Sequence, residues 1–308
     1  MKIFFIIASV IFIFAVFFLT AGYFAFCNAC KRRKNQGGVN VSRYKPYEKE
    51  MEKALEEYER AEKEEVSITS FDGLTLCASY FPSPKKSSKL IIAFHGYHSS
   101  APADFSCISA KLLENGFSLL YPDQRAHERS EGKYIGFGAL ERRDCKSWCE
   151  YAAERFGDDI DIYLYGVSMG GATVLMSAEL PLPKNVRAIV SDCAFTSPWD
   201  IIKNTLIHRH KIPPYPIIYF MNYWARQLAG FDFREVSSAE TARKNPYPTL
   251  YIHGNDDTFV PTEMSKLIHQ NASENCKLLL FDGARHARSY LSNSERYLYE
   301  MLRFLENL

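Results

Sequence analysis

Short, continuous apolar runs recur along most of the chain, and stretches with helical spacing separate them. The runs are predicted to be strands at 90–94, 117–121, 160–165, 186–190, 249–252 and 277–281. The stretches between them are predicted to be helices at about 103–115, 138–156, 170–180, 262–271 and 289–307. Runs that are apolar throughout are typical of strands buried on both faces, and alternation with helices indicates a mostly parallel sheet flanked by helices. The pattern predicts an α/β fold.

Two further strands are predicted upstream, at 66–69 and 74–81, and Asp72-Gly73 between them is a typical hairpin turn. The charged segment 47–65 precedes them. Its apolar residues recur at helical spacing and are Met51, Ala54, Leu55, Tyr58 and Ala61. This spacing predicts an amphipathic helix that packs its apolar stripe on the domain and leaves its charged face in solvent.

The alternation of strands and helices breaks between residues 196 and 245. This segment has no clear buried strand, and its prolines and aromatic residues include Pro198, Pro213, Pro214, Pro216, Trp199, Tyr215, Tyr219, Phe220, Tyr223 and Trp224. An insertion of this length between two strands predicts a small helical cap. Its aromatic residues either line an acyl or aromatic pocket or pack the cap onto the domain. Packing is the favoured interpretation for any single one, because helical spacing of aromatic residues is typical of packing.

The N-terminal 34 residues form a separate region. No charged residue occurs from Ile3 to Phe26, a stretch of 24 residues that is long enough to cross about 30 Å of hydrocarbon. We interpret it as an uncleaved, single-pass membrane anchor. A cleaved secretory signal is the alternative, but the apolar stretch is long for one and lacks a convincing small-x-small cleavage site. The basic run Lys31-Arg32-Arg33-Lys34 outweighs Lys2, so the positive-inside rule predicts a cytoplasmic catalytic domain.

The chain therefore divides into an anchor with a basic flank at 1–34, a linker and amphipathic helix at 35–65, and a catalytic domain at 66–308. Gly37-Gly38 in the linker indicates a flexible joint. With 308 residues, of which 47% are hydrophobic, the chain is long enough for one full core. The net charge of +1, with both signs interspersed, argues against nucleic acid as a partner.

Eight cysteines are scattered along the chain without the density of a disulfide scaffold. Two pairs, Cys27 with Cys30 and Cys145 with Cys149, have a spacing that metal sites use. Neither pair has a second pair or a nearby histidine to complete a zinc site. No metal site is predicted.

A candidate nucleophile lies in the sequence Gly166-Val167-Ser168-Met169-Gly170. This G-x-S-x-G directly follows the predicted strand at 160–165 and directly precedes a predicted helix. A turn this tight needs small residues on either side of the serine, and it presents the hydroxyl at the carboxyl end of the strand. Ser177 and Ser191 lack such a setting.

A serine hydroxyl needs a base within hydrogen-bond reach, and the base needs an acid to orient it. Asp257 follows the strand at 249–252, and His286 follows the strand at 277–281. The order of nucleophile, acid and base is the one expected for this fold. Asp256 and Asp192 remain alternative acids. The other histidines are interpreted as ordinary loop or surface residues: His95, His98, His127, His208, His210, His253 and His269.

From about residue 66 onward, the chain resembles the α/β-hydrolase superfamily, and within it bacterial esterase-like hydrolases related to acylaminoacyl-peptidase domains. Three motifs carry the resemblance: GVSMGG at 166–171, HGxxDxxVP at 253–261 and GAxH at 283–286. The resemblance implies that His95-Gly96-Tyr97 is the oxyanion loop, and that the amides of Tyr97 and Met169 hold the developing negative charge.

One loop departs from the superfamily's pattern. Members commonly carry D-x-R-G-H-G-x-S after the next strand, whereas residues 123–130 read DQRAHERS. Ala126 and Glu128 replace the two glycines. A carboxylate at Glu128 near the mouth of the site opposes acidic substrates, so the charge of the substrate stays open.

These observations predict a serine hydrolase that cleaves a carboxylic ester through an acyl-enzyme, with no cofactor and no metal. The expected partner is a small or lipid-like acyl substrate. A thioesterase or a peptidase would use the same residues, so both stay open. A membrane-tethered scaffold without turnover is the alternative from another class. Loss of Ser168, Asp257 or His286 would favour it, and all three are present.

Overall fold

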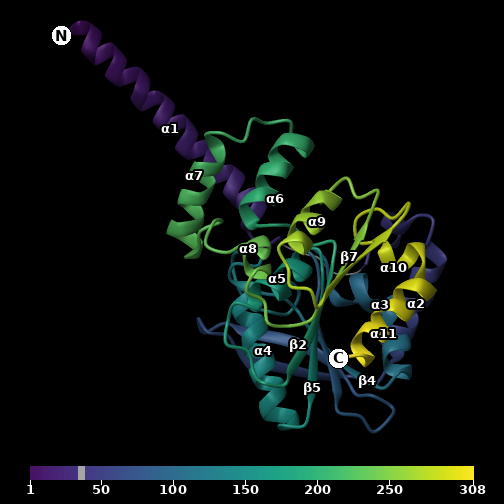
Figure 1. Ribbon diagram of the computed structural model, residues 1–308. Coiled ribbons are helices and arrows are strands. Elements are labelled where there is room, and N and C mark those ends of the chain that lie inside the picture. The colour runs from purple at the N-terminus through teal and green to yellow at the C-terminus, as the bar shows by residue number, and fades with distance from the viewer. Residues whose placement is uncertain (34–38) are drawn as a thin grey trace.

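The computed structural model describes residues 1–33 and 39–308, and it is built around one eight-stranded sheet (Figure 1). Lys34, Gly37 and Gly38 lie outside the described residues. The strands are β1 (Glu64–Thr69), β2 (Thr75–Phe81), β3 (Lys89–Phe94), β4 (Phe117–Pro122), β5 (Asp161–Val167), β6 (Val186–Asp192), β7 (Thr249–Gly254) and β8 (Cys276–Phe281). Their spatial order is β1-β2-β4-β3-β5-β6-β7-β8. Only the pairs β1–β2 and β2–β4 are antiparallel among these strands.

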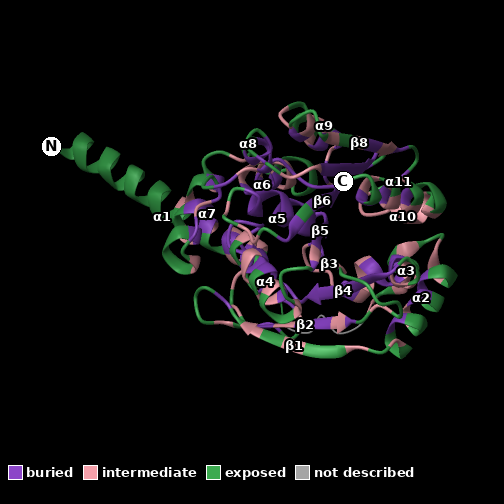
Figure 2. Cartoon of the chain, turned by 60° about the horizontal axis from the view of Figure 1, so that its bottom comes forward, coloured by how far each residue is buried: buried purple, intermediate pink, exposed green. Residues whose placement is uncertain are grey.

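Helices cover both faces of the sheet. The helices that contribute to the sheet's two faces are α2 (Glu48–Arg60), α3 (Ala101–Glu114), α4 (Glu141–Phe156), α5 (Met169–Ser177), α9 (Thr262–Gln270), α10 (Ser289–Ser292) and α11 (Ser294–Glu306). One apolar core holds Trp148 of α4 and Ala172 of α5, and the other holds Phe105 of α3 and Met301 of α11. Figure 2 shows these buried faces turned toward the strands. The chain has the mostly parallel α/β architecture that the alternation of elements predicts.

The predicted amphipathic helix is α2. It buries Met51, Ala54 and Tyr58, and the Tyr58 ring packs against Phe81 at 4.9 Å between centroids. The short helix η1 (Val41–Tyr44) precedes it.

The segment between β6 and β7 is helical, as an insertion of this length predicts. It contains α6 (Pro198–Asn204), the π-helical turn η2 (Thr205–Arg209), α7 (Ile217–Trp224), a second π-helical turn η3 (Ala225–Ala229) and α8 (Ser238–Ala242). Ile202 and Met221 point into the core, whereas Tyr215, Tyr219 and Tyr223 are 47%, 51% and 47% exposed. These three tyrosines therefore do not line an enclosed pocket.

The N-terminal helix α1 (Lys2–Cys30) has two different parts. Residues 1–17 are exposed and project away from the domain, as Figures 1 and 2 show. The second part runs beside α7, and its last turns insert Phe26 and Cys30, both fully buried, into the core. The helix is long and apolar enough to cross a membrane. Its C-terminal turns pack into the core of the domain that contains the sheet. The uniformly apolar sequence does not reveal this packing.

Candidate active site

The turn between β5 and α5 holds Ser168 in a strained conformation, with φ at 56°. A Cβ atom at Gly166 would lie 2.2 Å from the carbonyl oxygen of Gly170, and one at Gly170 would lie 1.8 Å from that of Phe94. No side chain fits at either position, because both contacts are with backbone. The Ser168 amide donates to the Asp192 carbonyl at 2.8 Å. The glycines thus permit the sharp turn that the G-x-S-x-G motif predicts.

Ser168, His286 and Asp257 come together at the carboxyl ends of their strands. His286 Nε2 lies 2.9 Å from Ser168 Oγ, and His286 Nδ1 lies 2.6 Å from Asp257 Oδ2. Ser168 is 5% exposed, and the His286 side chain is 23% exposed. With a proton on Nδ1, His286 donates to the carboxylate and accepts from the serine hydroxyl. This arrangement allows the imidazole to take the hydroxyl proton as the oxygen attacks a carbonyl carbon.

The Asp257 carboxyl group is held in its ionised form. Burial raises the pKa of this group, but hydrogen bonds from His253 and His286 outweigh burial and hold the pKa well below its usual range. Asp257 Oδ1 also accepts from the amides of Phe259 and Val260 at 2.8 and 2.9 Å. The fixed negative charge orients His286 and favours its protonated form during the reaction.

The two alternative acids lie elsewhere. Asp256 is exposed beside Asp257. Asp192 is buried, and its carboxyl group accepts from the hydroxyls of Ser289 and Tyr297, each at 3.1 Å. Burial raises the pKa of Asp192 to about 6. Asp192 supports the turn below Ser168 through its carbonyl. Of the three carboxylates, Asp257 is the one that hydrogen-bonds to His286.

The loop after β3 lies beside the nucleophile. A Cβ atom at Gly96 would be 3.4 Å from Ser168 Cβ, so this loop passes close to the reacting oxygen. Met169 begins α5, and the first amides of a helix have no carbonyl partner within the helix. Both features fit the expected oxyanion hole, and the assignment of the Tyr97 and Met169 amides to it stays a prediction. The Tyr97 hydroxyl donates to the Ala29 carbonyl of α1 at 2.7 Å.

His95, His127 and His253 are fully buried. His95 and His127 lie in loops, as the sequence interpretation has it, but that interpretation is wrong for His253, which lies in β7 and is neither a loop nor a surface residue. His253 Nε2 lies 3.2 Å from Asp257 Oδ2, the same oxygen that contacts His286. Its Nδ1 lies 2.6 Å from the Ser265 hydroxyl. The position of His253 at the end of a buried strand, four residues before the acid, is the signal that sequence reasoning missed.

The other two buried histidines connect the loops after β3 and β4. His95 Nε2 accepts from the Gln124 amide at 3.1 Å, and His127 Nε2 accepts from the His98 amide at 3.2 Å. Each Nδ1 faces a backbone carbonyl. Burial lowers the pKa of His95 to about 3 and that of His127 to about 4. Both imidazoles are therefore neutral near pH 7, and they hold the two loops together through backbone groups.

Residues 123–130, which depart from the superfamily's pattern, still adopt the backbone conformation that glycine favours. Ala126 and Glu128 have φ values of 61° and 37°. Residues with a Cβ atom are disfavoured in this left-handed region by about 1–2 kcal/mol each. The loop is held in place by Arg125, whose guanidinium binds Asp144 and Asp72. The loop thus forms despite the two replacements.

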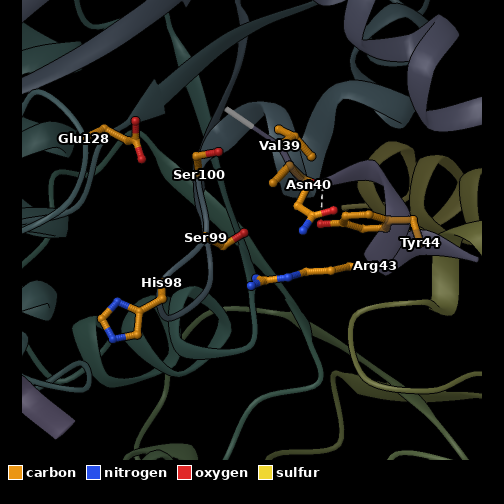
Figure 3. Close-up of a pocket in the computed structure, with 9 residues that line it drawn as sticks. Val39, Asn40, Arg43, Tyr44, His98, Ser99, Ser100 and Glu128 are labelled. Atoms are coloured by element: carbon orange, nitrogen blue, oxygen red, sulfur yellow. Dashed lines mark hydrogen bonds between the residues drawn. The ribbon is translucent and has the colours of Figure 1, made fainter. Parts of the chain in front are cut away.

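A small pocket of about 70 Å³ opens beside the loop after β3. Figure 3 shows its walls, which come from three parts of the chain: Val39, Asn40, Arg43, Tyr44, His98, Ser99, Ser100, Ala103 and Glu128. Ser168 is not among them. Glu128 contributes a carboxylate to this pocket, and burial raises its pKa.

One group of potential metal ligands overlaps the three aligned residues. Atoms of Cys193, Asp257 and His286 lie within 4.8 Å of one another. The carboxylate and the imidazole of this group already bind each other, and burial raises the pKa of the Cys193 thiol well above its usual value. The acid–base arrangement accounts for the group without a metal.

The fold and the family comparison define a serine hydrolase of the α/β-hydrolase superfamily. Residues 107–308 match the model of the prolyl oligopeptidase family, and the chain belongs to this family.

Curated proteins and solved structures are similar to most of this chain. The chain is 24% identical to the uncharacterized protein YqkD of Bacillus subtilis over 82% of this chain and 83% of that protein. It is 22% identical to the bifunctional esterase/perhydrolase DCH of Acinetobacter calcoaceticus over 71% and 92% of the two chains. The structure of the Pyrococcus furiosus esterase Pf2001 is similar with a TM-score of 0.65, 22% identity and coverage of 83% and 93%.

Proposed function

We propose that this protein is a membrane-anchored carboxylesterase with Ser168 as nucleophile, His286 as base and Asp257 as the orienting acid. The observation that carries the proposal is the position of His286, within 2.9 Å of Ser168 Oγ and 2.6 Å of Asp257 Oδ2. The esterases among the similar proteins support an ester substrate.

The reaction proceeds in two halves. Ser168 Oγ attacks the acyl carbon while His286 Nε2 takes the hydroxyl proton, and the amides of Tyr97 and Met169 bind the oxyanion. The ester bond breaks, and His286 returns the proton to the leaving alcohol. Water then attacks the acyl-enzyme with His286 as base again, releasing the carboxylic acid and restoring Ser168.

The anchor assignment draws support from packing at the end of α1. Phe26 and Cys30 fill the core, and Tyr97 binds the Ala29 carbonyl. Cleavage that removed these turns would open the core and release the loop beside Ser168, so we favour an uncleaved helix over a secretory signal. Lys31 and Arg33 are exposed next to the helix end, and under the positive-inside rule their charges support a cytoplasmic catalytic domain.

The substrate class is tested with the full-length protein in detergent. We expect hydrolysis of p-nitrophenyl esters, with a much lower kcat/KM for p-nitroanilides of the same acyl group, and complete loss of turnover in Ser168→Ala. A higher kcat/KM for the anilides would indicate a peptidase, which the family membership also accommodates. A folded wild-type protein that hydrolyses neither would favour the scaffold alternative.

Topology is tested separately by protease treatment of sealed cells and of inverted vesicles. A cytoplasmic domain is cut only in inverted vesicles. Cleavage of the domain in the sealed cells would contradict the proposed orientation.

A further inference from the structure

The cap carries a cluster of exposed apolar side chains that its packing leaves uncovered. We call this surface the cap face, and it consists of Ile207, Ile212, Tyr215, Tyr219, Tyr223 and Leu228. Each of these residues is between 37% and 51% exposed. An exposed apolar surface of this kind on a folded domain is typical of a site of interaction.

The cap face is continuous with the candidate membrane helix. Phe18 of α1 stacks on Phe220 of α7 at 5.9 Å between centroids, and Trp224 Nε1 donates to the Leu19 carbonyl at 2.8 Å. The two helices approach so closely that a Cβ atom at Gly22 would lie 2.4 Å from Phe220 Cβ. The helices α1 and α7 are therefore held side by side, as Figure 1 also shows.

The length of the free part of α1 determines how close α7 comes to a membrane. Residues 2–17 project from the domain, and at 1.5 Å per residue they rise about 24 Å. A hydrocarbon layer is about 30 Å thick and takes about twenty helical residues. A span that begins at Ile3 therefore extends to about Gly22, which already contacts α7. Insertion of α1 brings α7 into the interfacial region of the same bilayer.

The chemistry of the cap fits that location. Tyrosine and tryptophan side chains are enriched at membrane interfaces, because each combines an apolar ring with a polar group. The segment 203–228 contains Lys203, Arg209, Lys211 and Arg226 but no aspartate or glutamate. Basic residues next to exposed apolar residues favour a surface of anionic lipids.

The cap also contacts the candidate active site. Asn204 Nδ2 donates to the Phe259 carbonyl at 3.2 Å, and the Arg209 guanidinium lies 5.7 Å from the Phe259 ring. That ring packs edge-on against His286 at 4.9 Å between centroids. Phe259 thus contacts both this part of the cap and the base.

We propose that the cap face is a membrane-docking surface that lies in the headgroup region of the anionic bilayer crossed by α1. Docking in this position presents the active site to esters dissolved in that bilayer. The docking itself rests on the anchor assignment, and the delivery of substrate rests on the proposed esterase function.

Docking is measured by fluorescence quenching in the full-length protein. The chain has three tryptophans, and Trp148→Phe with Trp199→Phe leaves Trp224 as the single probe. The protein is reconstituted in phosphatidylcholine–phosphatidylglycerol vesicles that contain lipids brominated at different depths. We expect the strongest quenching of Trp224 by bromines near the headgroups.

A second probe confirms that α1 is inserted. In this probe, Trp224→Phe is added to the same background and Ile11→Trp supplies the fluorophore. We expect the strongest quenching of this tryptophan by bromines near the ends of the lipid acyl chains. Quenching of this probe without quenching of Trp224 would overturn the docking proposal. This measurement needs no turnover, so its result is independent of the esterase proposal.

Delivery of substrate is tested with Tyr219→Glu combined with Tyr223→Glu. The matched control is Tyr299→Glu on α11, where the tyrosine is 62% exposed and lies outside the cap. We compare kcat/KM for a long-chain ester dissolved in vesicles with kcat/KM for a short, water-soluble ester. The cap variant lowers the ratio of the two by about tenfold, because two negative charges oppose an anionic surface.

The control variant keeps the wild-type ratio. An unchanged ratio in the cap variant would overturn the delivery of substrate through the docked cap, as would an equal fall of the ratio in the control. Absence of turnover on both esters in the wild type would instead count against the esterase function, and the fluorescence measurement would still decide docking.

Discussion

Histidines at the carboxyl ends of the strands have different partners in the two halves of the sheet. His253, at the end of β7, and His286, after β8, both contact one oxygen of the Asp257 carboxylate. After β3 and β4, the ring nitrogens of His95 and His127 hydrogen-bond to backbone groups. Both halves flank the turn that carries Ser168. A histidine paired with a fixed negative charge can become protonated, whereas one that accepts from a buried amide must stay neutral.

This contrast separates acid–base chemistry from structural support. At β7 and β8, the Asp257 carboxylate stabilises the protonated form of the base, as proton transfer from Ser168 requires. After β3 and β4, His95 and His127 connect two loops beside the expected oxyanion hole and add no charge there. Similar residues in neighbouring turns thus have different roles, which their hydrogen-bond partners determine.

The largest effect is expected from Asp257→Asn. The amide cannot act as the paired anion and favours the wrong tautomer of His286, so kcat should fall by about 10⁴-fold. The matched control is Asp256→Asn, at the exposed neighbouring residue, which should keep wild-type kcat. Steady-state kinetics on a p-nitrophenyl ester checks both. If the two variants behaved alike, Asp257 would lose its assigned role.

The second prediction concerns the pH dependence of folding stability. The folded pKa of His127, about 4, lies below its unfolded value of about 6.5, so the unfolded chain binds more protons between these values. Stability contributed by the neutral form is complete above pH 6.5 and is lost as the pH falls toward 4. This loss amounts to about 3 kcal/mol.

The variant His127→Gln removes the titrating group, and its amide oxygen can replace Nε2 as the acceptor from the His98 amide. Relative to wild type, its free energy of unfolding should fall less between pH 7 and pH 4. Urea unfolding at several pH values measures the difference. Identical pH profiles for the two proteins would show that His127 is not held in its neutral form.

A smaller effect is expected from His253→Leu. This change removes one hydrogen-bond donor to the buried Asp257 carboxylate, so stability should fall by about 2 kcal/mol and kcat by about tenfold. The variant His253→Gln retains a donor and should recover part of both. Thermal unfolding and the pH profile of kcat distinguish a positioning role from a purely structural one. Equal kcat at all pH values in wild type and His253→Leu would refute the positioning role.

The smallest effect is expected from Ala126→Gly. Glycine relieves the positive φ of 61°, so the free energy of unfolding should rise by about 1 kcal/mol. Ala110→Gly in α3 is the control and should lower stability by a similar amount, because it lies within a helix. Chemical unfolding measures the free energy of unfolding of both variants, which should rise in the first and fall in the second. A loss of stability in both would mean that the loop gains nothing from glycine.

The succession of strands and helices along the chain and the elements around Ser168 could be predicted from the sequence because they depend on local patterns. The buried strands are continuous apolar runs, and the turn at Ser168 is specified by the two glycines that its close backbone contacts require. The positions of Asp257 and His286 follow from the strands that precede them. These parts of the prediction need no knowledge of distant contacts.

The remaining features depend on contacts between distant segments. His127 accepts from His98, which comes from another loop, so its burial cannot be read from neighbouring residues. Phe26 and Cys30 look like any other residues in or near the apolar run, yet they fill the core. The packing of α1 on the cap therefore cannot be predicted from hydropathy alone.

The most direct test of the active-site assignment is labelling of the full-length protein with a fluorophosphonate probe. Wild type, Ser168→Ala and His286→Ala are compared after thermal unfolding has shown that all three are folded. The account predicts rapid labelling of the wild type and none in either variant, whereas labelling that persists in Ser168→Ala, or a folded wild type that does not react, would contradict it.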